Sequence, residues 1–142
     1  MGKCVNSTIV PAPADEVWKV LRNFHSLAFA ADMDLTVEPG NDLASDQVGA
    51  KRVLNGAFHE TLVGLDDRRR ILTYTIDDGP GPVAADAVDN YVGTVRVFPV
   101  TDENTSYVLW ESRYDSPNDP EVGDFCNPIY QGLLNGLKKH FS

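Results

Sequence analysis

Apolar and polar residues alternate along most of the chain in short runs with the two-residue period of β-strands. Turn residues separate the runs, and Asn55-Gly56 is typical of a tight hairpin because both residues tolerate a positive φ. We expect strands over residues 3–10, 35–38, 50–54, 57–65, 70–77, 91–99 and 106–114. The longest connection, residues 78–90, contains Gly-Pro-Gly-Pro and is expected to form a mobile loop beside the pocket mouth.

The period changes to that of a helix just after the first run. Pro11-Ala12-Pro13 ends the strand, and Ala14, Val17, Trp18 and Leu21 then recur at helical spacing. The short, Ala-rich stretch of residues 24–33 predicts a second small helix.

A long helix is predicted at the C-terminal end of the sequence, over about residues 119–141. The apolar residues of its stripe are Phe125, Ile129, Leu133 and Leu137. Pro128 interrupts this segment, so either the helix kinks there or Asn127 caps a new helix. Gly132 and Gly136 either permit close contact with the sheet or leave room for a ligand.

Segregation of strands from helices predicts an α+β domain over residues 1–142 with a mostly antiparallel sheet. One long helix cannot cover seven strands of a flat sheet. The sheet must therefore curl around the helix, and the curling leaves a hollow between them. We expect this hollow to be a small-molecule pocket.

Composition excludes several classes of partner. The net charge is −9 and the isoelectric point is about 4.6, which argues against nucleic acid and anionic membranes as partners. No apolar run reaches the ~18 residues of a spanning helix, and we expect no signal peptide. Cys4 and Cys126 are expected to be free thiols in a cytoplasmic monomer or homodimer. His25, His59 and His140 have no ligand-like spacing, so neither a metal nor a cofactor is expected.

Glu60 is the candidate for acid–base chemistry, because it shares the strand parity of Phe58 and Leu62 and should face the apolar hollow. The alternative is a solvated or structurally paired glutamate. Which basic residue lies next to Glu60 depends on the length of the hairpin loop. A two-residue loop at Asn55-Gly56 would set Lys51 opposite Glu60, whereas a three-residue loop would bring Arg52 to the face of Glu60. The sequence does not choose between these registers.

Further residues are expected to line the pocket on grounds of strand parity and helical spacing. Residues of this kind are more often core filler, but buried tyrosine hydroxyls need partners. The expected lining residues are Tyr91, Trp110, Ser112, Tyr114, Phe125, Ile129 and Leu133.

Five segments resemble the polyketide cyclase/dehydrase family of the helix-grip superfamily, which also includes START domains and the birch-pollen allergen group. They are APADEVW at 12–18, VGAKR at 48–52, ETLVGLDD at 60–67, NYVGTVRV at 90–97 and VLWES at 108–112. The resemblance covers nearly the whole chain. It implies a helix-grip fold with a ligand pocket, and it is weakly specific for function.

Within that superfamily the chain is similar to the lachrymatory factor synthases, which use an arginine and a glutamate without a cofactor. The resemblance assigns these roles to Arg52 and Glu60, and it makes Tyr91 and Trp110 pocket residues. In the related abscisic-acid receptors, the residues aligned with Glu60 and Tyr91 contact the ligand. A receptor role is not expected here, because the connection between Arg52 and Glu60 is very short and Pro128 is a further difference.

The function expected from the sequence is binding of a small, largely apolar organic molecule. Cofactor-free isomerisation, cyclisation or dehydration would follow, with Glu60 moving a proton, Arg52 holding the developing anion and Tyr91 orienting the substrate. The alternative is a non-catalytic carrier that uses the same pocket.

Overall fold

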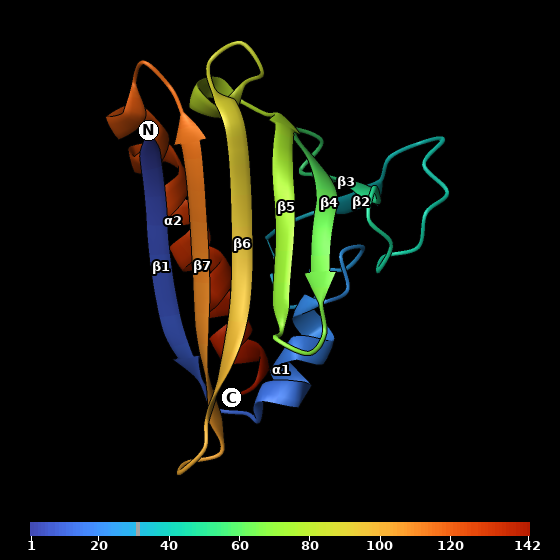
Figure 1. The fold of residues 1–142 in the computed structure, drawn as a ribbon, viewed down its shortest axis with the longest axis vertical. Helices are drawn as coiled ribbons and strands as arrows, with labels where there is room; N and C mark the ends of the chain where they lie inside the picture. Colours follow the sequence, from blue (N-terminus) through green and yellow to red (C-terminus); the bar gives the residue numbers. More distant parts are fainter. Residues whose placement is uncertain (31) are drawn as a thin grey trace.

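Seven antiparallel strands form one curved sheet, in the order β1-β7-β6-β5-β4-β3-β2 (Figure 1). The computed structural model describes residues 1–30 and 32–142. The strands are β1 (Gly2–Val10), β2 (Leu35–Val37), β3 (Lys51–Leu54), β4 (Phe58–Asp66), β5 (Ile71–Asp78), β6 (Asp89–Val100) and β7 (Thr105–Asp115). Register shifts beside Glu60 and between Leu62 and Gly64 interrupt the pairing of β4 with β5, and such bulges bend a strand.

The long helix α2 (Asp119–His140) lies across the concave side of the sheet behind β1 and β7 (Figure 1). It runs without interruption through Pro128, so no new helix begins there. The short helix α1 (Ala14–Leu21) and the 3-10 turn η1 (Gly81–Val83) complete the regular structure. The predicted α+β fold, with a curved antiparallel sheet around a long C-terminal helix, is confirmed. No helix within residues 1–30 and 32–142 is long and apolar enough to cross a membrane.

The second short helix predicted over residues 24–33 is wrong for the described part of that segment, which excludes residue 31. The backbone there makes separate single turns, such as the hydrogen bond from Ala30 N to Leu27 O. The apolar side chains that suggested a helix instead attach this segment to the core. Phe24, Leu27 and Phe29 are all buried in the core.

The hairpin between β3 and β4 has a three-residue loop, Asn55 to Ala57, because Leu54 pairs directly with Phe58. Asn55 and Gly56 both have positive φ, and Ala57 N donates to Leu54 O. In this register Arg52 lies opposite Glu60. Lys51 lies opposite Thr61 and donates to its hydroxyl on the other face. Of the two registers that the sequence left open, the structure has the one that pairs Arg52 with Glu60.

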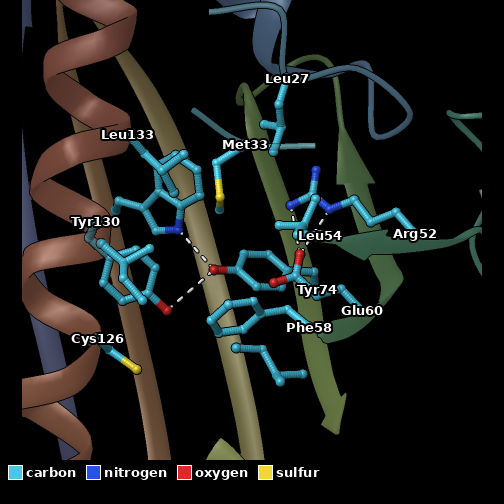
Figure 2. A pocket seen from close by; sticks show the side chains of 13 residues that line it. Leu27, Met33, Arg52, Leu54, Phe58, Glu60, Tyr74, Cys126, Tyr130 and Leu133 are labelled. Atoms are coloured by element: carbon cyan, nitrogen blue, oxygen red, sulfur yellow. Dashed lines mark hydrogen bonds and ion pairs between the residues drawn. The ribbon is translucent and has the colours of Figure 1, made fainter. Parts of the chain in front are cut away.

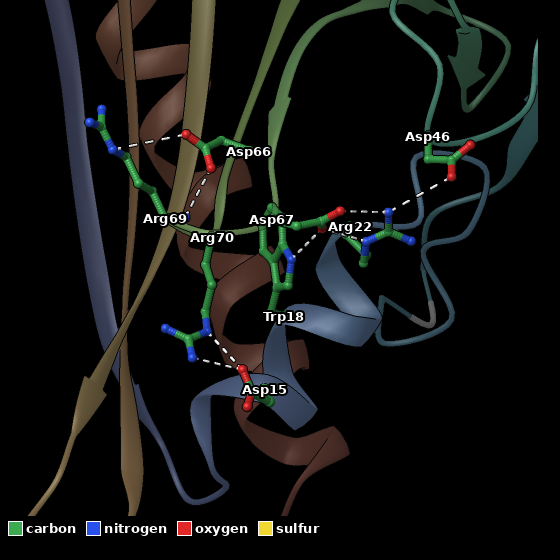
Figure 3. A network of polar contacts seen from close by, with 8 residues as sticks. All are labelled: Asp15, Trp18, Arg22, Asp46, Asp66, Asp67, Arg69 and Arg70. Carbon is green, nitrogen blue, oxygen red and sulfur yellow. Dashed lines mark hydrogen bonds and ion pairs between the residues drawn. The ribbon is translucent and has the colours of Figure 1, made fainter.

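Polar contacts outside the core fasten α1 to the turn between β4 and β5 (Figure 3). Arg22 Nε and Trp18 Nε1 each donate to Asp67 Oδ1 at 2.8 Å. These hydrogen bonds, that of Arg22 first, lower the pKa of Asp67. Arg70 forms a second link to Asp15 at 2.7 Å. Together they hold α1 over the end of the sheet.

The long loop expected at residues 78–90 is shortened by β6, which begins at Asp89. The remaining segment is fastened at both ends. Val83 is fully buried, and Asp78 Oδ1 accepts hydrogen bonds from the backbone N–H groups of Gly79 and Ala85. The expected mobility of this loop stays a prediction.

Gly93 on β6 makes room for Tyr74, its partner on β5. A methyl group at Gly93 would overlap the ring of Tyr74, whereas one at Gly64 would meet only Thr73, at 3.5 Å. Neither glycine has a positive φ, so space alone separates the two positions.

We predict that Gly93→Ala lowers the free energy of unfolding by roughly 1–3 kcal/mol, the usual cost of overpacking a core. Gly64→Ala, the matched control, should leave that free energy unchanged or raise it by up to about 1 kcal/mol. Urea unfolding followed by circular dichroism measures both. Equal stabilities for the two variants would mean that the ring of Tyr74 does not pack against β6 as described.

Candidate functional site

A small cavity of about 30 Å³ lies between the sheet and α2 (Figure 2). This volume has room for about two water molecules. Its lining is apolar apart from an ion pair, tyrosine hydroxyls, one indole N–H and one thiol. The lining residues are Leu27, Met33, Arg52, Leu54, Phe58, Glu60, Tyr74, Ile76, Trp110, Cys126, Ile129, Tyr130 and Leu133. An organic ligand therefore fits only if lining side chains move, and Met33 has the flexible, unbranched side chain best suited to this.

Arg52 and Glu60 form a buried ion pair on one side of the cavity (Figure 2). Arg52 Nε and Nη2 both lie 2.8 Å from Glu60 Oε1, and each residue is only 5% exposed. Arg52 Nη1 donates to the carbonyl of Phe24 at 3.3 Å, and the guanidinium lies 4.0 Å above the centre of the Phe24 ring. Phe24 thus fixes the side of Arg52 that Glu60 does not touch.

The second carboxylate oxygen of Glu60, Oε2, accepts no hydrogen bond from the described residues. Burial raises the pKa of Glu60 above its ordinary value of 4.5, and Arg52 partly offsets this rise. The carboxyl group therefore combines a raised proton affinity with a free oxygen beside an apolar space. These are the properties required of a general base or acid.

Five of the residues expected to form the site lie together around this cavity: Arg52, Glu60, Trp110, Ile129 and Leu133. Parity along β4 and β7 and helical spacing along α2 indicated the direction of Glu60, Trp110, Ile129 and Leu133, whereas the direction of Arg52 follows from the hairpin register that the sequence left open. Whether they contact a ligand stays a prediction.

The structure places the four other expected lining residues, Tyr91, Ser112, Tyr114 and Phe125, outside the cavity. Tyr91 is buried one layer behind it, where its hydroxyl contacts Tyr130 and donates to Ser112 Oγ at 3.1 Å. The ring of Tyr114 stacks on that of Tyr91, with centroids 5.4 Å apart. Phe125 stacks on the outer side of the lining residue Phe58. These side chains support the wall, because Tyr130 and Phe58 occupy the lining positions in front of them.

Sequence reasoning missed Tyr74 and Tyr130, whose hydroxyl groups lie at the cavity wall (Figure 2). Tyr74 shares a strand face with Leu72 and Ile76, so the parity argument used for Glu60 could have found it. Tyr130 lies on the buried side of α2 with Cys126 and Leu134, one step around the helix from the stripe that was predicted. Burial raises the pKa of Cys126 to about 11, which keeps its thiol neutral.

A wider cleft of about 690 Å³ opens beside the cavity, between the C-terminal half of α2 and residues 28–30, 32 and 33. Met33, Ile129 and Leu133 line both spaces and so separate them. Gly132 faces the cleft, and a methyl group there would have no atom within 4 Å, whereas a methyl group at Gly136 would collide with the carbonyl oxygen of Phe29. Gly132 therefore leaves room, and Gly136 permits close contact.

Within residues 1–30 and 32–142, no group of three or more His, Cys, Asp and Glu side chains could hold a metal ion. The polar groups that the cavity itself presents are a carboxylate, a guanidinium, tyrosine hydroxyls, an indole N–H and a thiol.

Solved structures of several bacterial proteins share this fold. A protein of Nitrosospira multiformis is 34% identical, with a TM-score of 0.93 over 99% of this chain and 96% of its own. XoxI of Bacillus cereus is 27% identical, with a TM-score of 0.76 over 99% and 96%. A protein of Thermobifida fusca is 25% identical, with a TM-score of 0.76 over 99% and 93%. Comparison with curated proteins gave no match.

Residues 1–142 match one protein family, described as polyketide cyclase / dehydrase and lipid transport. The match agrees with the motifs at 12–18, 48–52 and 60–67 and with the curved sheet around α2. The chain therefore belongs to the polyketide cyclase / dehydrase and lipid transport family.

Proposed function

We propose that the protein binds a small, largely apolar organic molecule between the sheet and α2 and catalyses acid–base chemistry on it without a cofactor. The reaction class is isomerisation, cyclisation or dehydration. Membership of the family supports ligand binding in general. The observation that carries the catalytic part is the free Oε2 of Glu60, an oxygen of a residue only 5% exposed, for which the hydrogen bonds of the described residues include no donor.

Glu60 takes a proton from the substrate through Oε2. Its raised pKa makes the carboxylate a stronger base than an exposed glutamate, and the same group then returns the proton at another atom. In an isomerisation the proton that leaves one carbon is the proton that arrives at another. The reaction therefore balances without any oxidant, reductant or second substrate.

Arg52 stabilises the anion that forms when the proton leaves. A guanidinium carries five N–H groups. Two of them are directed at Glu60 and one at the carbonyl of Phe24, which leaves two for the substrate. Tyr91 orients the substrate indirectly, because its hydroxyl contacts that of the wall residue Tyr130.

A non-catalytic carrier is the second candidate, and two observations favour it. Glu60 and Arg52 neutralise each other, as in a purely structural ion pair, and most of the remaining lining is apolar. The family description also includes lipid transport. A carrier needs only the apolar space, whereas an enzyme needs the carboxylate.

We predict that Glu60→Gln lowers turnover by roughly 10²–10⁴, because the amide keeps the shape but cannot transfer the proton. Binding affinity should change little. Native mass spectrometry of the protein purified from its source identifies the bound molecule, whose conversion is then assayed with each variant. His59→Gln is the matched control, since His59 is the preceding residue on β4 and its side chain is 41% exposed.

Wild-type turnover in Glu60→Gln would end the acid–base proposal. A bound molecule that neither wild type nor His59→Gln converts would identify the protein as a carrier.

We also predict that ligands enter through the cleft between α2 and residues 28–30, 32 and 33. Gly132→Phe should narrow the cleft without disturbing the core, because Gly132 has open space in front of it. Ligand association should therefore become at least tenfold slower. Gly132→Ala, the control, is too small to block the cleft and should stabilise α2 by up to about 1 kcal/mol. Stopped-flow fluorescence of Trp110 measures the rates, in a Trp18→Phe background. Equal association rates for both variants would place the entrance elsewhere.

A further inference from the structure

Five polar groups form a hydrogen-bonded row that begins at the cavity wall, with Trp110, Tyr74 and Tyr130, and continues behind it, with Tyr91 and Ser112. Trp110 Nε1 donates to the Tyr74 hydroxyl at 2.9 Å, and this hydroxyl donates to that of Tyr130 at 3.3 Å. The Tyr130 hydroxyl contacts that of Tyr91, which donates to Ser112 Oγ at 3.1 Å. The row crosses from the sheet to α2 and back, and every member is at least 95% buried. Figure 2 shows the contact between the hydroxyl groups of Tyr74 and Tyr130.

The row contains more hydrogens than its contacts use. Each hydroxyl group has one hydrogen, and the indole of Trp110 has one that it can only donate. Four hydrogen-bonded contacts therefore link five groups that carry five hydrogens. Hydroxyl hydrogens rotate, so the direction of donation along the tyrosines can reverse. In the reversed direction Tyr130 donates to Tyr74, and the hydrogen of Tyr74 is free for another acceptor.

That free hydrogen would be directed at the cavity. Tyr74 lines the cavity together with Arg52 and Glu60, and its ring centre lies 5.7 Å from the guanidinium carbon of Arg52. Its oxygen would then accept two hydrogen bonds, from Trp110 and Tyr130, and such donors polarise a hydroxyl and strengthen the bond it donates. Burial raises the pKa of Tyr74 and Tyr130 well above the ordinary value, so both remain protonated donors.

The cavity therefore has two different polar sides. Glu60 Oε2 is an acceptor and a base, and Tyr74 is a donor on a neighbouring strand. The ring of Tyr74 lies between them and is part of the apolar lining (Figure 2). A ligand that matches both sides has an acceptor oxygen and, close to it, a hydrogen acidic enough for a carboxylate to remove.

We propose that Tyr74 donates a hydrogen bond to an acceptor oxygen of the ligand, and that the ligand is a compact apolar carbonyl compound. When the ligand oxygen binds, the direction of hydrogen-bond donation along the row reverses. The inference rests on the proposed function and adds its substrate class. Glu60 removes a proton from the carbon beside the carbonyl group, and the C–H electron pair forms the carbon–carbon double bond of an enolate. The carbonyl electrons move to the oxygen, which Tyr74 stabilises, and the proton then returns to a different carbon.

The test compares acetophenone with ethylbenzene, which has nearly the same shape but no acceptor oxygen. Infrared difference spectroscopy of ¹³C-carbonyl acetophenone reports hydrogen bonding directly, because a donor lowers the carbonyl stretching frequency. We expect a lowered frequency in the wild-type complex, relative to acetophenone in hexane. We also expect acetophenone to bind about tenfold more tightly than ethylbenzene, as one hydrogen bond allows.

Three tyrosine variants separate the donor from its neighbours. Tyr74→Phe should abolish both the frequency shift and the preference for the ketone. Tyr130→Phe should retain both, because it removes the competing acceptor and leaves the hydrogen of Tyr74 free. Tyr114→Phe is the control, since its ring stacks on Tyr91 but its hydroxyl lies outside the row. If Tyr74→Phe does not fold, Tyr130→Phe still tests whether Tyr74 is the donor, because the proposal requires this variant to retain the frequency shift.

A frequency shift that persists in Tyr74→Phe, or is lost in Tyr130→Phe, would overturn the proposal. Loss of the shift in Glu60→Gln with Tyr74 intact would assign the donor to the ion pair and overturn it equally. If ethylbenzene binds as tightly as acetophenone and no shift is seen, this inference fails while the proposed binding function stands. If the wild-type protein binds neither compound, this inference also fails, and native mass spectrometry of the purified protein decides the proposed binding function separately.

Discussion

The buried pair of Arg52 and Glu60 is the interaction on which the rest of the site depends. Removing two charges from water costs several kcal/mol per ion, and only good geometry with additional hydrogen bonds offsets this cost. The chain supplies that geometry through the three-residue loop at Asn55, which sets β3 and β4 in register. Phe24 adds a carbonyl acceptor and a ring face for the guanidinium. A shift by one residue would bring Lys51 opposite Glu60 and leave Arg52 facing solvent.

The closed state of the cavity follows from the same packing. Phe24 and Leu27 belong to a segment that is held in the core by single turns, and this segment brings Met33 against α2. A space of about 30 Å³ is all that remains. The adjoining cleft is much larger and is separated from the cavity by three side chains. Ligand binding in this fold thus depends on movement of a few apolar side chains, which costs less than opening the sheet or displacing the ion pair.

Much of the fold could be predicted from the sequence, because strand parity and helical spacing are local properties. Parity placed Glu60 and Trp110 on the concave face, and it would have placed Tyr74 there as well. The hairpin register could not be predicted, because Asn-Gly accommodates both a two-residue and a three-residue loop. Which buried side chains reach the cavity depends on tertiary packing, because one side chain can cover another. Tyr91 was expected at the wall, but Tyr130 from α2 occupies that place, and no local pattern reveals such long-range packing.

Carbon-13 NMR of the side-chain carboxyl groups of glutamate tests directly whether Glu60 presents a desolvated carboxyl group to the ligand space. The Glu60 signal is assigned from its absence in Glu60→Gln. We predict that this signal titrates with a pKa above the ordinary 4.5 and changes when the bound molecule is removed. A signal that titrates with a pKa at or below 4.5 and does not respond to the bound molecule would contradict the claim.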